Sequence, residues 1–243
     1  MRRFTDFLIL LAVLAAMIVL FGLLRDTFWS FTTLGNIANR SPALALVATG
    51  MTVVMITGGI DLSVGSVLGL CGAVVGVMMA DWQWGLSLAL LGSVLVGSAI
   101  GGTTGAVSVK LRLPSFIVSL GMLEMARGLS FLVTNSQTKY IGAAVETLGA
   151  PFGGLVISPA FVISLVIVVA GQVVLSHMAV GRHWIAIGAN REAALVSGVP
   201  VDRPRILAHA LLGALFFHAT ASTEIYPLTL HAALPISSRR PSS

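Results

Sequence analysis

The chain has 243 residues, of which 56% are hydrophobic and 9% are charged. A soluble domain has about 45–50% apolar residues, glycine included, and about 25% charged ones, so this composition excludes a water-soluble globular enzyme and predicts a helical membrane protein. The formal net charge of +5 arises from basic residues scattered through short loops without interleaved aromatic residues, which argues against nucleic-acid binding.

Seven apolar runs follow one another along the chain. A bilayer core about 30 Å thick needs about 20 helical residues to cross it, and backbone groups in lipid must be paired within the segment. The expected spans are Phe7–Leu24, Pro42–Ile60, Val64–Met79, Leu86–Val109, Phe116–Val133, Ile157–Leu175 and a seventh that begins near Ile206 and stops early. The predicted fold class is therefore all-α, a polytopic transmembrane helical bundle.

The first run is interpreted as a retained anchor. Arg2 and Arg3 precede it, as in a secretory signal peptide, but the run is longer than the usual apolar core of such a peptide and residues 25–28 contain no small-residue cleavage site.

Basic residues predict the orientation, with the N-terminus in the cytosol. The inner segments then hold Arg2, Arg3, Lys110, Arg112, Arg182, Arg191, Arg203 and Arg205, and the outer ones hold only Arg25, Arg40 and Lys139. Residues 42–79 form either two full spans or a re-entrant hairpin. Because both alternatives leave the later loops on the same sides, the charges do not distinguish them.

Small residues recur at Gly97, Gly101 and Gly105 in the fourth run. This small-xxx-small spacing lets helix backbones approach closely in lipid. We expect it to serve packing inside the bundle, with a dedicated dimer face as the alternative.

No motif in the sequence supports catalysis or metal binding. The lysines, Lys110 and Lys139, are followed by Leu111 and Tyr140, so the phosphate-binding pattern G-x-x-x-x-G-K-[ST] does not occur. Neither G-x-S-x-G nor H-E-x-x-H is present, and the single cysteine, Cys71, cannot form a disulfide within the chain. We therefore expect no enzymatic activity and no cofactor bound by this chain.

The stretch from Thr57 to Ser66 is the first candidate functional segment. Gly58 and Gly59 weaken helix continuity by about 1 kcal/mol each, and Asp61 or Ser63 can accept the free amide hydrogens of the next helix. The segment is either a tight turn with an N-cap, or a broken helix whose carboxylate lines a translocation path.

A pair of charges inside the fifth run is the second candidate. Glu124 and Arg127 are three residues apart, so they share a helix face and can pair. Each would cost about 2.5–3.5 kcal/mol in the middle of a membrane helix, so we expect them to point into the bundle, as an internal pair or as the polar lining of a path.

The longest cytosolic loop, 176–205, is the third candidate. Asn190 can cap a short helix, Glu192 suits its positive first turn, and Gly198 followed by Pro200 ends it. Such a helix is either a solvated connection or a surface that a second protein binds.

These three segments together resemble the permease subunit of bacterial ABC importers for ribose and related monosaccharides. The similarity lies in three ordered motifs: Gly58 to Ser66, Ile117-Val118-Ser119-Leu120-Gly121 with Arg127-Gly128-Leu129, and Gly181 to Asp202, which contains the importer pattern E-A-A-x-x-x-G. It extends from about Phe7 to Phe217. Glu124 departs from it, since an uncharged residue is expected beside Arg127-Gly128.

The resemblance implies an inner-membrane permease domain over residues 1–217, which pairs with a second copy in the lipid bilayer. It would receive sugar from a periplasmic binding protein and dock on a cytosolic ATP-binding subunit that holds ATP and magnesium. Docking residues implied by the resemblance are Arg191, Glu192, Ala193, Ala194 and Gly198. Candidate residues along the path are Gly58, Gly59, Asp61, Ser63, Glu124 and Arg127.

Residues 218–243 differ in character from the rest of the chain. The stretch from Thr223 to Ser237 has two prolines, mixed polarity and no helical stripe, whereas the family continues through further spans. It resembles translated sequencing-adapter DNA joined to a truncated gene, and the alternative is a genuine tail.

Three other functions are compatible with a polytopic bundle. An ion-gradient-driven carrier would use Asp61, Glu124 and Arg127 as a relay. A non-transporting scaffold or fragment would need none of these residues. An intramembrane hydrolase is disfavoured, because no nucleophile and base occur at a suitable spacing.

Overall fold

The computed structural model describes residues 2–139, 141, 151 and 156–217. Over these residues the chain forms helices and no strand. In chain order the elements are α1 (Arg2–Leu24), the 3-10 helix η1 (Asp26–Trp29), α2 (Phe31–Arg40), α3 (Pro42–Ile56), α4 (Val64–Ala80), α5 (Leu86–Lys110), α6 (Ser115–Thr134), α8 (Pro159–His177), α9 (Ala179–Ala189), α10 (Arg191–Val196) and α11 (Asp202–Ala214). The all-α fold class is confirmed, and the tail at 218–243 lies outside the described residues.

Among the residues that the structure describes, five segments are long and apolar enough to cross a membrane. They are Phe7–Leu24, Phe31–Ile56, Leu86–Lys110, Ser115–Thr134 and Pro159–His177. The expected third span exists as α4, whose 17 residues make it shorter than these five. The expected seventh is α11, which has 13 residues and begins at Asp202.

The second span differs from its prediction at both ends. At its start the span is extended by α2, which is separated from α3 only by Ser41. The α2 helix begins after Ser30, whose hydroxyl oxygen accepts a hydrogen bond from the Thr33 amide at 3.2 Å. The span loses its last residues because α3 ends at Ile56 rather than Ile60.

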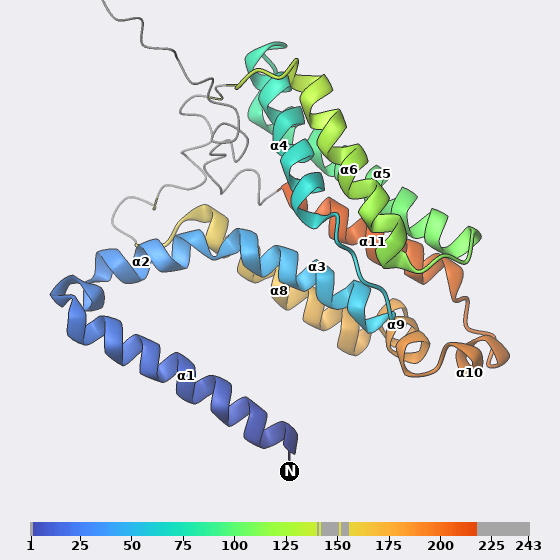
Figure 1. Cartoon of the computed structure of the whole chain (residues 1–243), viewed down its shortest axis with the longest axis horizontal. Helices are drawn as coiled ribbons and strands as arrows, with labels where there is room; N and C mark the ends of the chain where they lie inside the picture. Colours follow the sequence, from blue (N-terminus) through green and yellow to red (C-terminus); the bar gives the residue numbers. More distant parts are fainter. Residues whose placement is uncertain (1, 140, 142–150, 152–155, 218–243) are drawn as a thin grey trace, which may run out of the picture.

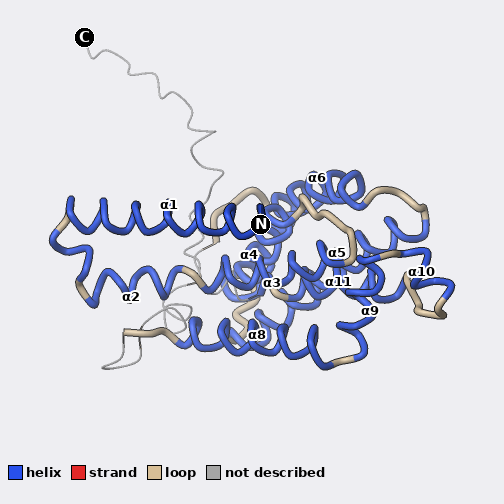
Figure 2. Tube along the Cα trace, turned by 90° about the horizontal axis from the view of Figure 1, so that it is seen from below, coloured by secondary structure: helices blue, strands red, loops and turns tan. Residues whose placement is uncertain are grey.

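Two groups of helices make up the bundle. Figure 1 shows α4, α5, α6 and α11 packed together at the upper right and α3 lying along α8, with α9 at their lower end. The α1 helix packs mainly on η1, and none of its Phe7–Leu24 window is buried; Figure 2 shows it running apart from the other helices. Its exposed apolar surface requires lipid or another protein chain.

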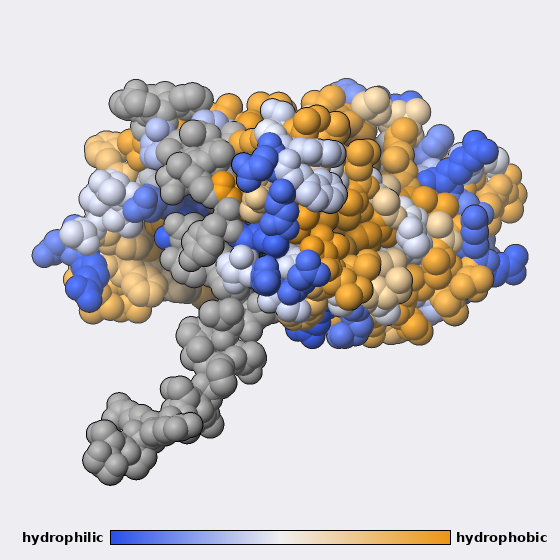
Figure 3. Space-filling model, turned by 90° about the horizontal axis from the view of Figure 1, so that it is seen from above, coloured by the Kyte–Doolittle hydropathy of each residue, from blue (hydrophilic) through white to orange (hydrophobic). Residues whose placement is uncertain are grey.

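Apolar side chains cover much of the molecular surface. In Figure 3 most of the visible right-hand part is hydrophobic, with hydrophilic residues gathered toward its right-hand end. In a soluble protein so much exposed apolar surface would promote aggregation, whereas in a bilayer it faces lipid.

The main core lies where α3, α4, α9 and α11 meet. Its buried members include Val54, Leu70, Trp184 and Leu212. The Trp184 indole is 1% exposed and donates a 2.8 Å hydrogen bond to the Pro204 carbonyl, which ties α9 to the start of α11.

Glycines bring α5 and α11 into direct backbone contact. A Cβ added at Gly97 would overlap the Gly213 carbonyl oxygen, one at Gly101 would overlap the His209 carbonyl oxygen, and one at Gly105 would come within 2.9 Å of the Ile206 Cα. The Gly97/Gly101/Gly105 repeat therefore packs α11 inside the bundle, as expected.

Candidate functional site

The break between α3 and α4 begins with a glycine-terminated helix end. The Gly58 amide donates to the Met55 carbonyl at 2.9 Å and the Gly59 amide donates to the Val54 carbonyl at 3.0 Å, which is the Schellman pattern. Gly58 has a φ of 77°, a conformation that favours glycine. The predicted weakening of helix continuity at the two glycines is confirmed, although the helix ends at Ile56 and not at Ile60 as expected.

Beyond the glycines the backbone is braced by α6 rather than by helical bonds. The Ile60 amide donates to Ser115 Oγ at 2.9 Å and the Leu62 amide donates to Ser119 Oγ at 3.0 Å. Both serines are buried. Sequence reasoning missed them, although two serines four residues apart at the start of an apolar helix indicate a polar seam on one face.

Asp61 and Ser63 lie on the opposite side of this extended segment from Ile60 and Leu62. Asp61 is 4% and Ser63 3% exposed. Asp61 Oδ1 accepts the Ser63 amide at 2.9 Å and the Ser63 hydroxyl at 2.6 Å. The N-cap expectation is therefore wrong in detail: Ser63 occupies the N-cap position of α4, but its side chain makes no cap bond, and its hydroxyl donates to Asp61.

Removing both serine hydroxyls is expected to loosen the break. In the double variant Ser115→Ala and Ser119→Ala the Ile60 and Leu62 amides lose their partners. A fully buried group left unpaired costs about 1–3 kcal/mol, and the cost here is smaller because both bonds are partly buried. Cys71 on α4 is buried, so faster maleimide labelling of its thiol in detergent would report the loosening.

Ser130→Ala is the matched control for this experiment, because the Ser130 hydroxyl bonds only the Arg127 carbonyl of its own helix, at 2.7 Å. Equal labelling rates in the double variant, the control and the unaltered chain would show that the serines do not hold the break.

Glu124 and Arg127 pair on the open face of α6. Arg127 Nη1 lies 3.7 Å from Glu124 Oε1, and the side chains are 63% exposed for Arg127 and 69% for Glu124. The predicted pairing is confirmed, but the expectation that both point into the bundle is wrong for the described chain. The reason is that α6 turns a different stripe, including Ser119, Met122 and Ala126, toward its neighbours.

The structure thus separates the candidate path residues into two groups. Gly58, Gly59, Asp61 and Ser63 lie in one braced segment, whereas the Glu124–Arg127 pair lies on another face of α6. No hydrogen bond or ion pair joins the two groups within the part of the chain that the structure describes.

The cytosolic loop expected at 176–205 contains two helices. The first, α9, was not predicted; its Gly181 and Gly188 lie against the backbone of Leu175 and Ile56. The second, α10, was predicted: Asn190 Oδ1 accepts the Ala193 amide at 3.0 Å. Its far end is a second Schellman motif at Gly198, which has a φ of 79°.

One face of α10 is seated on the bundle and the rest is free. Ala194 is 5% exposed and packs with Ile187 and Val201, so it anchors the helix instead of facing a partner. Arg191, Glu192 and Ala193 are exposed. Sequence reasoning missed Leu195 and Val196, which are 53% and 91% exposed; two adjacent apolar residues at the end of a short polar helix were the available signal.

Positive charge surrounds the base of α10. Burial, together with the nearby Arg191 guanidinium, lowers the pKa of Arg205, and the Asp202 carboxylate opposes this shift. The end of the molecule that bears α10 therefore combines exposed apolar residues with guanidinium groups, a composition typical of protein interfaces.

Comparison with known proteins identifies a permease family. The family model described as branched-chain amino acid transport system / permease component matches residues 33–219. The autoinducer 2 import system permease protein LsrC of Enterobacter sp. is 34% identical over 215 residues, which cover 88% of this chain and 61% of that protein. The ribose import permease protein RbsC of Escherichia coli is 32% identical over 212 residues, which cover 84% of this chain and 65% of that protein. The chain thus spans less than two thirds of these relatives, and no solved structure matches it.

Proposed function

We propose that this chain, which belongs to the permease family of the branched-chain amino acid transport system type, is the membrane-spanning subunit of an ATP-driven sugar importer. Its relatives include permeases named for ribose import and autoinducer 2 import, which supports a monosaccharide or related sugar as the substrate. The observation that carries the proposal is α10, a short, firmly capped helix whose Glu192, Leu195 and Val196 stand free at one end of the bundle.

The α10 helix would dock on a cytosolic ATP-binding subunit, which would hold ATP and magnesium. The exposed Leu195 and Val196 supply apolar contact and Glu192 supplies one charge, while Ala194 fixes the helix to the bundle. The permease would contribute no catalytic residue, and its own role would be mechanical. In this proposal the N-terminus would lie in the cytosol and the chain would belong to a multi-pass protein of the bacterial inner membrane.

A second copy of the permease would cover the open face of α6. Lipid contact costs about 2.5–3.5 kcal/mol for each charged group in mid-membrane, and Glu124 and Arg127 are both more than half exposed in the single chain. A polar passage between two copies would remove that cost. A periplasmic sugar-binding protein would deliver the sugar to its outer end.

Transport would then follow rigid-body movement of the helices. Nucleotide binding and hydrolysis in the partner would displace α10 and switch the passage between inward-open and outward-open forms. The braced break at Gly58–Ser63 would provide irregular backbone held against α6 by the Ser115 and Ser119 hydroxyls, as membrane-embedded segments of this kind require protein partners for their backbone groups.

Energy dependence tests the proposal. In cells that also express the ATP-binding subunit and the sugar-binding protein, radiolabelled sugar uptake is expected to stop on ATP depletion and to persist when a protonophore collapses the ion gradient. The purified permease alone is expected to hydrolyse no ATP. Uptake that survives ATP depletion but fails with the protonophore would instead support a carrier that uses Asp61, Glu124 and Arg127 as a relay.

A further inference from the structure

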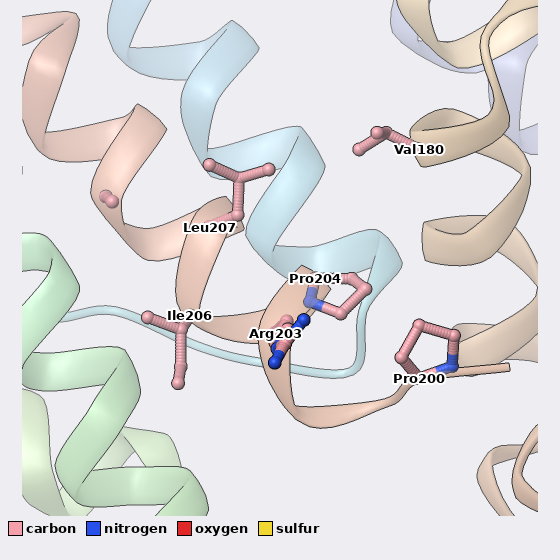
Figure 4. A pocket seen from close by; sticks show the side chains of 7 residues that line it. Val180, Pro200, Arg203, Pro204, Ile206 and Leu207 are labelled. Atoms are coloured by element: carbon pink, nitrogen blue, oxygen red, sulfur yellow. The ribbon is translucent and has the colours of Figure 1, made fainter.

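An apolar groove lies beside α10, between the start of α9 and the first turns of α11. Its volume is about 470 Å³, and its walls include Val180, Pro200, Pro204 and Leu207. Figure 4 shows Val180 facing Leu207 across the opening, with Pro200 and Arg203 at the lower edge. Arg203 is the charged residue among those that line the groove.

The groove sits at the level where the membrane helices end. The span Pro159–His177 finishes three residues before Val180, and α11 begins at Asp202, next to Arg203. The α10 helix, with its exposed Arg191 and Glu192, lies between these two ends in the sequence. An apolar groove at such a boundary can be reached from the lipid side.

The Arg203 guanidinium is available to a ligand. Its side chain is exposed, and the ion pairs formed among the described residues, Glu124–Arg127 and Asp81–Lys139, do not involve it. A free cation at the rim of an apolar groove is complementary to an amphiphile with an anionic head.

We propose that this groove binds an anionic phospholipid of the cytosolic leaflet, with one acyl chain along Val180 and Leu207 and the phosphate at Arg203. Basic pockets between helices on the cytosolic side of membranes are suited to such headgroups. A free phosphate ion would contact Arg203 alone and leave the apolar walls empty, whereas a phospholipid can contact both Arg203 and the apolar walls. The bound lipid would fill the space between α9 and α11 and so steady the base of α10.

Native mass spectrometry of the purified full chain in detergent tests the proposal. Phosphatidylglycerol is expected to bind at least about fivefold more tightly than phosphatidylcholine, the ratio expected for one arginine near a membrane surface. Arg203→Gln is expected to abolish this preference and Arg203→Lys to retain it. The matched control is Lys110→Gln, which removes an exposed charge at the end of α5, outside the groove.

A second pair of variants tests the acyl-chain part. Leu207→Trp narrows the groove and is expected to weaken the binding of both lipids. Leu211→Trp, one turn further along α11 and outside the groove, is expected to weaken the binding of neither. Equal binding of the two lipids by the unaltered chain, or an equal loss in Lys110→Gln, would overturn the proposal. So would competition by inorganic phosphate, which would indicate an ion site. The measurement needs no transport, so its failure would leave the proposed function untouched.

Discussion

Replacement of Gly101 by valine is expected to prevent α11 from packing on α5. A Cβ at this position would overlap the carbonyl oxygen of His209, which is backbone and cannot rotate away. Overpacking usually costs about 1–3 kcal/mol of folding stability, because nearby side chains can move to relieve part of it. Backbone cannot move in this way, so we expect folding stability to fall by more than about 3 kcal/mol here. Gel filtration and thermal unfolding in detergent should show an aggregated or strongly destabilised protein.

The neighbouring Gly102 provides the control. A Cβ there would lie 3.7 Å from the Ala210 Cβ, an ordinary contact, and alanine is favoured over glycine in helices by about 1 kcal/mol. Gly102→Ala should therefore be as stable as the unaltered chain or more stable. A well-folded Gly101→Val protein would contradict the close approach of the two helices.

If α10 docks as proposed, replacement of Val196 by aspartate is expected to uncouple the chain from the proposed ATP-binding subunit. Val196 is 91% exposed, so the change should leave the fold intact. A hot-spot residue contributes about 2 kcal/mol or more to binding, which corresponds to about thirtyfold weaker association. Co-purification of the two subunits and sugar uptake should both fall. Glu192→Lys, which reverses the acidic charge in the first turn of α10, should act in the same direction.

Two further variants make this result interpretable. Val196→Leu keeps the apolar contact and should retain uptake, and Leu111→Asp places the same new charge at another exposed apolar position, in the turn after α5. Normal co-purification of Val196→Asp with the ATP-binding subunit would mean that docking occurs elsewhere.

Local sequence patterns predicted most helices and the glycine at which α10 ends, Gly198. Apart from the start of α1, the ends of α1, α4, α5 and α6 fall within one residue of the ends of the corresponding apolar runs. The agreement arises because a bilayer requires each span to be a continuous apolar helix. The predicted start of α10 at Asn190 and its predicted end at Gly198 are both observed. Both depend only on a few adjacent residues: a side-chain N-cap and a glycine in the left-handed conformation.

Features that depend on neighbours could not be predicted in this way. Periodicity places Glu124 and Arg127 on one face, but only the packing of α6 shows that this face is open. The bonds from Ser115 and Ser119 join segments more than fifty residues apart. The α9 helix was missed because its stability comes from Trp184 and from glycines pressed against other helices.

The glycine contact between α5 and α11 also has a mechanical consequence. Most packed helices are separated by side chains that can change rotamer. Here the carbonyl oxygens of α11 contact the glycines of α5 directly. We therefore expect α5 and α11 to move together as one rigid body. Since α10 joins α11 through the short segment 197–201, a displacement of α10 that moves α11 would also move α5, which contacts α11 from Gly97 to Gly105.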